Sequence, residues 1–445
     1  MMKCLSFLFL FSLSISYTKA NDYLPYLMYQ HIPECTEKKF VQPVETVGGE
    51  FTDRIPKNVY CKYSDNIDSA RNEGFIEFRK LLKRTDLKRV RIYATYPTSN
   101  RIRPLLCTLA KDGVPIQIIG MSTDDFLKKS KTKQNSIEKN TIALKGCDTD
   151  NIEFKVFRAG GGIINFHPQI YVFETVDETY LVTSSGHPQR GFTYNFDSWF
   201  FYRDKSNSHF IRAHNCFLNT IDLMISQEYG PINFEGTFKN CINNKLNKEE
   251  ELISFYFLPF DSYSLRHDLS TLINDSKKIN ISSMSVGNKW LLKELISALN
   301  DGVEVNLLLD DDQYYFYSNK CKKKSKDCPF YGQRNVYEEW INPIKERGGN
   351  VKYLQTKHEG GVEQVLHNKF ITFNGSVKAV FYGSANLTSA ALGENYRSKN
   401  IENTYITSDI NLVNSFEKTF WDMWKSAQPE SRLPINLDDI EMVKE

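Results

Sequence analysis

Two stretches of the chain carry a histidine followed by a polar cluster at the same spacing. His167 is followed 17 residues later by Ser184, and His367 is followed 17 residues later by Ser384. Lys369 stands two residues after the second histidine, so on a strand both side chains lie on one face. An imidazole can act as a nucleophile or transfer a proton, and a lysine can neutralise an anionic oxygen. The repeat therefore predicts one active site built from two halves.

The two copies differ in chemistry. The second serine lies in the run Gly383-Ser384-Ala385-Asn386, and the first in Thr183-Ser184-Ser185-Gly186. We therefore expect Gly186 to replace the asparagine and Gln169 to replace the lysine. An amide donates hydrogen bonds but carries no charge, and losing one cation and one donor removes about 3 kcal/mol of transition-state stabilisation. Two nearby side chains are candidates for the missing donor: His187 and Gln189.

The elements that carry these residues follow the same order in both halves. A strand, a helix, an Asp-Gly-Val turn and a second strand form a βαβ unit, and such units build parallel sheets. In the first half we expect these at 89–96, 105–110, 112–114 and 115–119, and in the second half at 278–286, 289–299, 301–303 and 304–309.

Further strands complete each half. Strands at 152–157 and 351–354 lead through the glycines at 160–162 and 360–361 to the histidines, and strands at 199–202 and 404–407 close the halves. A duplicated α/β unit of about 200 residues is the simplest account of this order. We expect two tandem domains, each with a mixed β-sheet flanked by helices, related by a pseudo-twofold axis.

His367-x-Lys369 followed by Gly383-Ser384-x-Asn386 resembles the HKD motif of the phospholipase D superfamily. The resemblance covers nearly the whole chain after residue 20, because that family also carries one module in each half. It implies two phospholipase D-like domains, at 21–240 with a degenerate motif and at 241–445 with an intact one.

The resemblance also implies the roles of the site residues. A phosphohistidine intermediate forms on one imidazole, the other imidazole protonates the leaving alkoxide, and no metal or cofactor is required. Glu402 is expected to pair with His367, and Asp197 to serve as the acidic residue of the first copy. The implied catalytic residues are His367, Lys369, His167, Asn386, Glu402 and Ser384, and the implied substrate-binding residues are Gln169, Ser184 and Asp197. Asn374 takes the place of the family's aspartate.

The N-terminus and the composition bear on the compartment and the substrate. Lys3, an apolar run and Thr18-Lys19-Ala20 predict a signal peptide at 1–20, and hence secretion or delivery to the endolysosomal lumen. Without residues 1–20, 54 basic residues balance 54 acidic ones, because two of the 56 lysines and arginines lie in that segment. A chain without net basic charge gives no general argument for nucleic acid, so we slightly prefer a phospholipid substrate.

The cysteines and sequons fit a secreted chain. Eight of the nine cysteines follow residue 20, an even number that favours disulfides, and Cys321 and Cys328 bracket a lysine-rich loop. No Cys/His cluster has zinc spacing. Asn274 and Asn280 head Asn-x-Ser sequons and are candidate glycosylation sites.

The expected function is therefore that of a secreted phospholipase D-like hydrolase, a phosphodiesterase acting in lipid degradation. Transient contact with a membrane surface is expected, and oligomerisation is not required. Two alternatives stay open: a nuclease of the same superfamily, and a pseudoenzyme that binds phosphate or lipid without turnover. Gln169 and Gly186 favour the pseudoenzyme, whereas the intact second motif and His167 favour the enzyme.

Overall fold

The computed structural model describes most of the chain between residues 24 and 427. The described residues are 24–32, 38–43, 59–61, 72–97, 101–121, 147, 150–157, 165–187, 195–205, 208–226, 252–310, 341–354, 365–393, 400–427, 429 and 440–442. The predicted signal peptide, the predicted boundary at 240–241, the predicted glycine turns, Gln189 and the Cys321–Cys328 loop lie outside them. Among the described residues, no helix is both long and apolar enough to cross a membrane.

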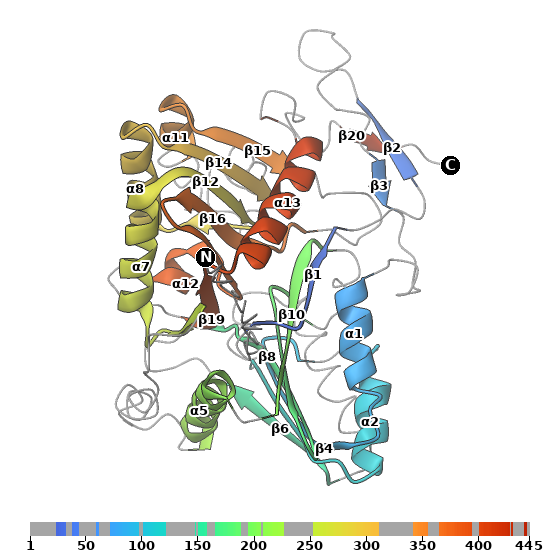
Figure 1. Ribbon diagram of the computed structural model, residues 1–445. Coiled ribbons are helices and arrows are strands. Elements are labelled where there is room, and N and C mark those ends of the chain that lie inside the picture. Colours follow the sequence, from blue (N-terminus) through green and yellow to red (C-terminus); the bar gives the residue numbers. More distant parts are fainter. Residues whose placement is uncertain are drawn as a thin grey trace, which may run out of the picture.

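The first half of the chain forms a seven-stranded mixed sheet (Figure 1). Its order is β1 (Leu27–His31), β10 (Asp197–Asp204), β9 (Thr179–Ser184), β8 (Gln169–Thr175), β4 (Leu87–Ala94), β5 (Ile116–Met121) and β6 (Ile152–Phe157). The pairs from β1 to β4 are antiparallel, and the pairs β4–β5 and β5–β6 are parallel. Among the described residues, three helices accompany this sheet: α1 (Glu73–Leu81), α2 (Arg103–Lys111) and α5 (His209–Ser226).

The second half forms a sheet with the same order and the same strand directions. Its order is β11 (Ile253–Leu258), β19 (Asn400–Thr407), β17 (Lys378–Gly383), β16 (Lys369–Gly375), β12 (Ser276–Ser283), β14 (Glu304–Asp310) and β15 (Asn350–Leu354). The helices that the structure describes in this half are α7 (Ser262–Asp275), α8 (Lys289–Asn300), α11 (Asn342–Glu346), α12 (Ser389–Leu392) and α13 (Ile410–Ser426). The expected mixed α/β class is confirmed.

Short strands complete the described fold. β13 (Val286–Gly287) pairs in parallel with β18 (Leu387–Thr388). Three strands that are distant in sequence form a separate small sheet: β20 (Ile440–Met442), β2 (Lys38–Pro43) and β3 (Val59–Cys61). The strand β7 (Asn165–Phe166) belongs to the first half but pairs with β19 of the second.

The predicted Asp-Gly-Val turns end α2 and α8 at equivalent places. Gly113 has a φ of 86° and Gly302 a φ of 84°. Only glycine adopts this left-handed conformation without a steric cost, which explains the residue at both helix ends. The next residue, Val114 or Val303, donates its N–H back to the last turn of the helix at 3.0 and 2.9 Å. The chain then enters the parallel strand β5 or β14.

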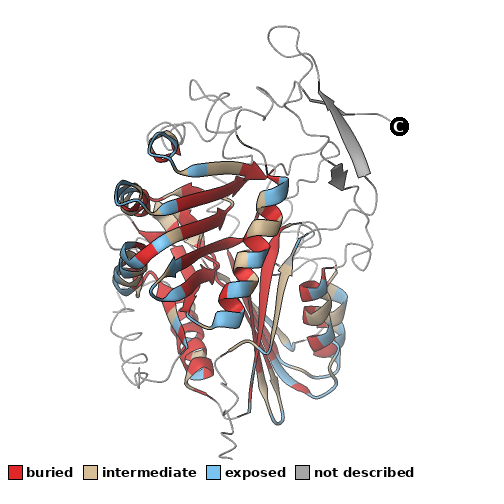
Figure 2. Cartoon of the chain, turned by 45° about the horizontal axis from the view of Figure 1, so that its top comes forward, coloured by how far each residue is buried: buried red, intermediate tan, exposed pale blue. Residues whose placement is uncertain are grey.

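Three apolar clusters organise the molecule into layers. One cluster contains α1 and α2 residues against the outer face of the first sheet, and a second contains α7 and α8 residues against the outer face of the second. The third joins the inner faces of both sheets with α5 and α13. In Figure 2, the buried strands of the second sheet lie between α7 and α8 on one side and α13 on the other. The two halves therefore share one core, which includes Phe166, Phe200, Phe370 and Tyr382.

The structure bears on the predicted glycosylation sites and disulfides. Asn280 is fully buried, and its amide donates to Thr372 Oγ1 at 3.2 Å and to Glu417 Oε1 at 3.0 Å. A glycan cannot be attached at this position in the folded chain, so the prediction for Asn280 is wrong; Asn274 is exposed. Cys107 and Cys147 form a disulfide, with Cα atoms 5.2 Å apart.

Candidate active site

Next to the histidines, a short segment of each half pairs with a segment of the other half. β7 runs parallel to β19, and His167 donates its backbone N–H to Ile401 O at 2.9 Å. In the same way, Phe196 forms a parallel bridge with Leu366 and donates its N–H to Val365 O at 3.0 Å. Each histidine segment is therefore fixed against the acidic strand of the other half.

This exchange pairs each histidine with a carboxylate from the opposite half. His167 Nδ1 lies 2.8 Å from Glu402 Oε2, and His367 Nδ1 lies 3.1 Å from Asp197 Oδ1. Both carboxylates are completely buried. The expectation that Glu402 pairs with His367 is wrong, because the crossed strand ends bring Glu402 to His167 instead. A carboxylate on Nδ1 fixes the ring's tautomer and orientation, and it stabilises the charged ring.

A serine holds each carboxylate in place. Ser384 Oγ donates to Glu402 Oε2 at 2.6 Å and accepts from the backbone N–H of Asn403 at 3.0 Å. In the first half, Ser185 Oγ donates to Asp197 Oδ1 at 3.2 Å and accepts from the backbone N–H of Ser198 at 2.9 Å. The two arrangements have the same connectivity. The serines therefore orient the carboxylates, which in turn orient the histidines.

The strand registers show which residues of the two halves are equivalent. Gln169 lies opposite Ala94 in the first sheet, and Lys369 lies opposite Ser283 at the same place in the second. Glutamine therefore replaces the lysine, as expected from the sequence.

The same registers correct the expected alignment of the serines. Ile170, which follows Gln169, lies opposite Thr183, and Phe370, which follows Lys369, lies opposite Tyr382. Thr183 and Tyr382 are therefore equivalent. Two residues further along come Ser185 and Ser384, which are therefore equivalent. Ser184 is one residue early, and its Oγ donates to Gly186 O at 2.5 Å rather than to a carboxylate. The assignment of Ser184 as the counterpart of Ser384 is wrong.

The one-residue shift also reassigns the asparagine position. Gly186 becomes the counterpart of Ala385, and His187 the counterpart of Asn386. A Cβ atom on residue 186 would lie 2.5 Å from Asp197 Oδ1, so glycine makes room for the carboxylate. The expectation that Gly186 replaces the asparagine is wrong, because His187 holds that position.

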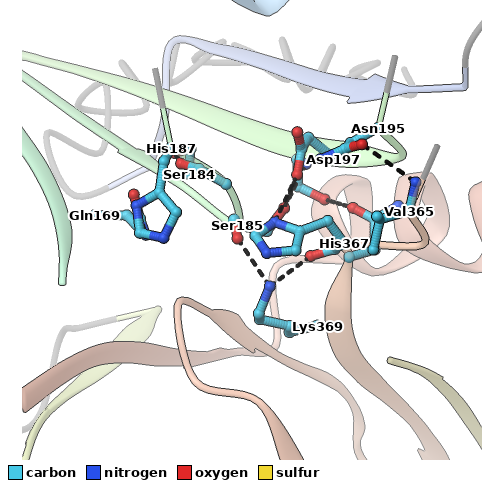
Figure 3. Close-up of polar contacts among 12 residues, drawn as sticks. Gln169, Ser184, Ser185, His187, Asn195, Asp197, Val365, His367 and Lys369 are labelled. Carbon is cyan, nitrogen blue, oxygen red and sulfur yellow. Dashed lines mark hydrogen bonds and ion pairs between the residues drawn. The ribbon is translucent and has the colours of Figure 1, made fainter. Parts of the chain in front are cut away.

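Lys369 is the cation of the site. Its side chain is buried, and Nζ donates to Ser185 O at 2.9 Å and to His367 O at 2.7 Å (Figure 3). Burial lowers the pKa of Lys369 to about 7, and the Asp197 and Glu402 carboxylates oppose that shift. Through these two hydrogen bonds the ammonium group contacts Ser185 of the first half and His367 of the second.

On the other side of the site, Gln169 contacts His187, as Figure 3 shows. Gln169 Nε2 lies 2.5 Å from His187 Nδ1 and 3.0 Å from Nε2. The Tyr171 hydroxyl donates to Gln169 Oε1 at 3.1 Å, and the backbone N–H of Gln169 donates to Asn403 Oδ1 at 2.8 Å. The glutamine side chain is therefore fixed at both ends of its amide.

Three histidine rings gather at this junction. The centroid of His187 lies 5.1 Å from that of His167 and 6.2 Å from that of His367. Burial, together with the charge of Lys369, lowers the pKa of His367 to about 4, although Asp197 opposes the shift. Burial also holds the pKa of His187 well below its usual value. Both rings are therefore neutral near neutral pH.

Asn386 follows Ala385 at the end of β17, and its Oδ1 is buried without a hydrogen-bond partner among the described residues. Within the same part of the chain, no group of three or more His, Cys, Asp or Glu side chains could hold a metal ion.

The structure thus brings together His167, Gln169, Asp197, His367, Lys369, Ser384 and Glu402 from the predicted set. It adds three residues that sequence reasoning missed or only considered: Ser185, His187 and Tyr171. Either Ser184 or Ser185 can be aligned with Ser384. Aligning Ser185 matches the small Gly186 with the small Ala385 and the polar His187 with the polar Asn386, and this agreement is the sequence signal for His187.

Part of the chain is similar to a known protein family. Residues 269–424 match the family described as "Cardiolipin synthase, PLD-like domain". No curated protein sequence matches the chain.

The chain is also similar to solved structures. A phosphatidylserine synthase from Haemophilus influenzae has a TM-score of 0.52 at 11% identity, covering 83% of this chain and 86% of its own. NucT from Helicobacter pylori gives 0.30 at 17% identity, covering 40% and 97%, and yeast tyrosyl-DNA phosphodiesterase gives 0.43 at 11% identity, covering 74% and 85%.

The family match defines the class of one part of this protein. Residues 269–424 form a phospholipase D-like domain. The second half of the chain belongs to the phospholipase D superfamily, and the resemblance expected from the His-x-Lys and Gly-Ser-x-Asn motif is confirmed.

Proposed function

We propose that this protein is a phosphodiesterase in which His367 and His167 act on one phosphorus atom. The observation that carries the proposal is the crossed pairing of the two rings with buried carboxylates of the opposite halves, at 2.8 and 3.1 Å. Because a carboxylate contacts Nδ1 of each ring, Nε2 is the nitrogen left to react, and Lys369 supplies the positive charge.

We assign His367 as the nucleophile. Its ring is neutral above about pH 4, where its pKa lies. Its Nδ1–H donates to Asp197, so the lone pair that attacks is on Nε2. The new P–N bond forms as the bond from phosphorus to the leaving alkoxide breaks. Lys369 stabilises the non-bridging oxygens while negative charge develops on them.

His167 then acts as the general acid and base. Glu402 stabilises its charged form, which gives its Nε2 proton to the leaving alkoxide. The neutral ring next removes a proton from a water molecule that attacks the phosphohistidine. The P–N bond breaks, a phosphomonoester leaves, and both rings return to their starting states.

The domain organisation, compartment and substrate complete the proposal. Two tandem phospholipase D-like domains, 21–240 and 241–445, follow a signal peptide at 1–20 that sends the protein outside the cell or to the endolysosomal lumen. The Cys107–Cys147 disulfide supports an oxidising compartment. Because basic and acidic residues balance after residue 20, a phospholipid is preferred to a nucleic acid.

One observation favours a second candidate, a protein that binds phosphate without turnover. Gln169 stands where a second lysine would supply charge, so the first half-site has no cation of its own. The complete pair of oriented histidines favours the enzyme.

The test is hydrolysis by the chain from residue 21 onward, with EDTA present, on phosphatidylcholine, cardiolipin and single-stranded DNA. We expect hydrolysis of a phospholipid by the wild type and none by His367→Ala. His267→Ala, which changes an exposed histidine on α7, is the matched control and keeps the activity. Cleavage of DNA alone contradicts the lipid preference, and no turnover on any substrate supports the binding protein.

A further inference from the structure

The half-site that has lost its lysine carries three linked differences from its counterpart. Gln169 stands in place of Lys369, His187 in place of Asn386, and Tyr171 in place of Ile371, which follows from the same register. The hydroxyl, the amide and the ring form one hydrogen-bonded chain. No such chain is needed where a lysine supplies the charge.

Each contact in this chain fixes the next. The Tyr171 hydroxyl donates to Gln169 Oε1, which turns the amide NH₂ toward His187. The closer ring nitrogen of His187, Nδ1, lies 2.5 Å from Gln169 Nε2 and accepts its hydrogen bond. A neutral imidazole that accepts at one nitrogen carries its proton at the other. His187 Nε2 lies 3.0 Å from the same amide nitrogen. That nitrogen is only a donor, so the Nε2 proton has to be donated to another acceptor, such as a ligand.

The position of His187 suits such a ligand. Its ring has centroid distances of 5.1 Å to His167 and 6.2 Å to His367, the two rings proposed to act on phosphorus. Tyr96 contacts the ring edge-on at 5.2 Å and limits its movement. Burial opposes protonation of His187, and so do the charge of Lys369 and the charges of His167 and His367 whenever those rings are protonated. The ring therefore acts as a neutral donor.

We propose that His187, oriented by Tyr171 through Gln169, is the second phosphate-binding donor of the site and takes over the task of the missing lysine and asparagine. This inference rests on the proposed function, because the ligand is the phosphoryl group that His367 attacks. With Lys369 as its cation and His187 as a neutral donor, the site matches the single charge of a phosphodiester. A doubly charged phosphomonoester is the poorer ligand.

Binding of inorganic phosphate, measured by calorimetry at pH 5.5, tests the proposal without requiring turnover. One lost hydrogen bond to a charged ligand weakens binding roughly tenfold, which we expect for His187→Ala. His187→Asn keeps a neutral donor, as in the other half, and binds within about threefold of the wild type.

Tyr171→Phe removes only the orienting hydroxyl. We expect it to weaken phosphate binding by roughly threefold in the wild type and to have no further effect in His187→Ala, because coupled residues are not additive. Tyr180→Phe removes a tyrosine hydroxyl that donates to Glu178, and it serves as the control without effect.

The outcomes separate the two proposals. Phosphate binding that depends on His187, in a protein without turnover, supports the donor and overturns the enzymatic function. Turnover with phosphate binding unchanged in His187→Ala overturns the donor and leaves the function intact. Additive effects of Tyr171→Phe and His187→Ala, or no phosphate binding by the wild type, also overturn the proposed chain.

Discussion

The crossed pairing of histidines and carboxylates makes a prediction about which chemical step each carboxylate supports. Asp197 lies in the first half but contacts His367, the proposed nucleophile. Glu402 lies in the second half but contacts His167, the proposed acid. Asp197→Asn should therefore impair attack on phosphorus, and Glu402→Gln should impair protonation of the leaving group.

The magnitude follows from the contacts. Each substitution keeps the shape of the side chain but removes the charge from a fully buried partner of a ring nitrogen. A hydrogen bond to a charged group contributes about 1.5–3 kcal/mol, and about 1.4 kcal/mol corresponds to a factor of ten in rate. We expect each variant to lose roughly 10- to 150-fold in kcat/KM on a substrate whose leaving group needs protonation.

A series of methyl aryl phosphodiesters with leaving groups of increasing pKa separates the two roles. Protonation matters little for a nitrophenolate and much for a poor leaving group. Glu402→Gln should therefore make kcat/KM fall more steeply with leaving-group pKa than in the wild type. Asp197→Asn should lower kcat/KM by a constant factor across the series.

Glu417→Gln on α13 is the matched control. Its carboxylate contacts Asn280, Thr372 and Trp421 rather than a histidine, so it should leave the slope unchanged. If the steeper slope belongs to Asp197→Asn and the constant loss to Glu402→Gln, the assignment of the two histidines is refuted.

Three further predictions concern pH, space and metal. The kcat/KM profile should rise through about pH 4, as His367 loses its proton, and fall above about pH 7, as Lys369 loses its charge; a flat profile from roughly pH 5 to 9 would contradict these assignments. Gly186→Ala should lower kcat/KM by at least about tenfold, because its Cβ displaces Asp197. Gly302→Ala, with φ at 84° and open space around it, should instead lower only the melting temperature. EDTA should leave kcat unchanged, because Lys369 supplies the positive charge; loss of activity that added zinc restores would refute this.

Much of the fold could be predicted because its signals are local. Apolar strands and Asp-Gly-Val turns recur in the same order, and both Gly113 and Gly302 adopt the positive φ that their turns require. The strand predicted at 152–157 has the observed bounds, and the helix at 289–299 differs by one residue. The strands at 199–202 and 404–407 are longer than predicted because polar residues extend both, including the buried Asp197 and Glu402.

The partners within the site could not be predicted from spacing. Which carboxylate meets His167 depends on the pairing of β7 with β19, and this contact joins residues 235 positions apart. A sequence repeat suggests that each half completes its own set, whereas the folded chain exchanges the sets across the junction. The repeat correctly identified the residue types but assigned the carboxylates to the wrong histidines.

The equivalence of Ser185 with Ser384 depended on one extra residue between β8 and β9. Equal spacing of 17 residues favoured Ser184, whereas the strand registers and the hydrogen bonds of Ser185 to Asp197 and Ser198 identify Ser185 as the counterpart of Ser384. Because of the same extra residue, the sequence alignment matched Gly186 rather than His187 with Asn386. A motif with two adjacent serines contains too little information to fix its own alignment.

The central claim is that one phosphorus atom is transferred to a histidine between the two halves. The P–N bond of a phosphohistidine breaks in acid. The intermediate is therefore trapped by rapid quenching into alkali and located by mass spectrometry of peptides. The account predicts an alkylphosphoryl group on His367 in the wild type and its accumulation in His167→Ala with a nitrophenyl phosphodiester, because the base for the second step is missing. Turnover without a phosphoryl adduct on either histidine would contradict the account.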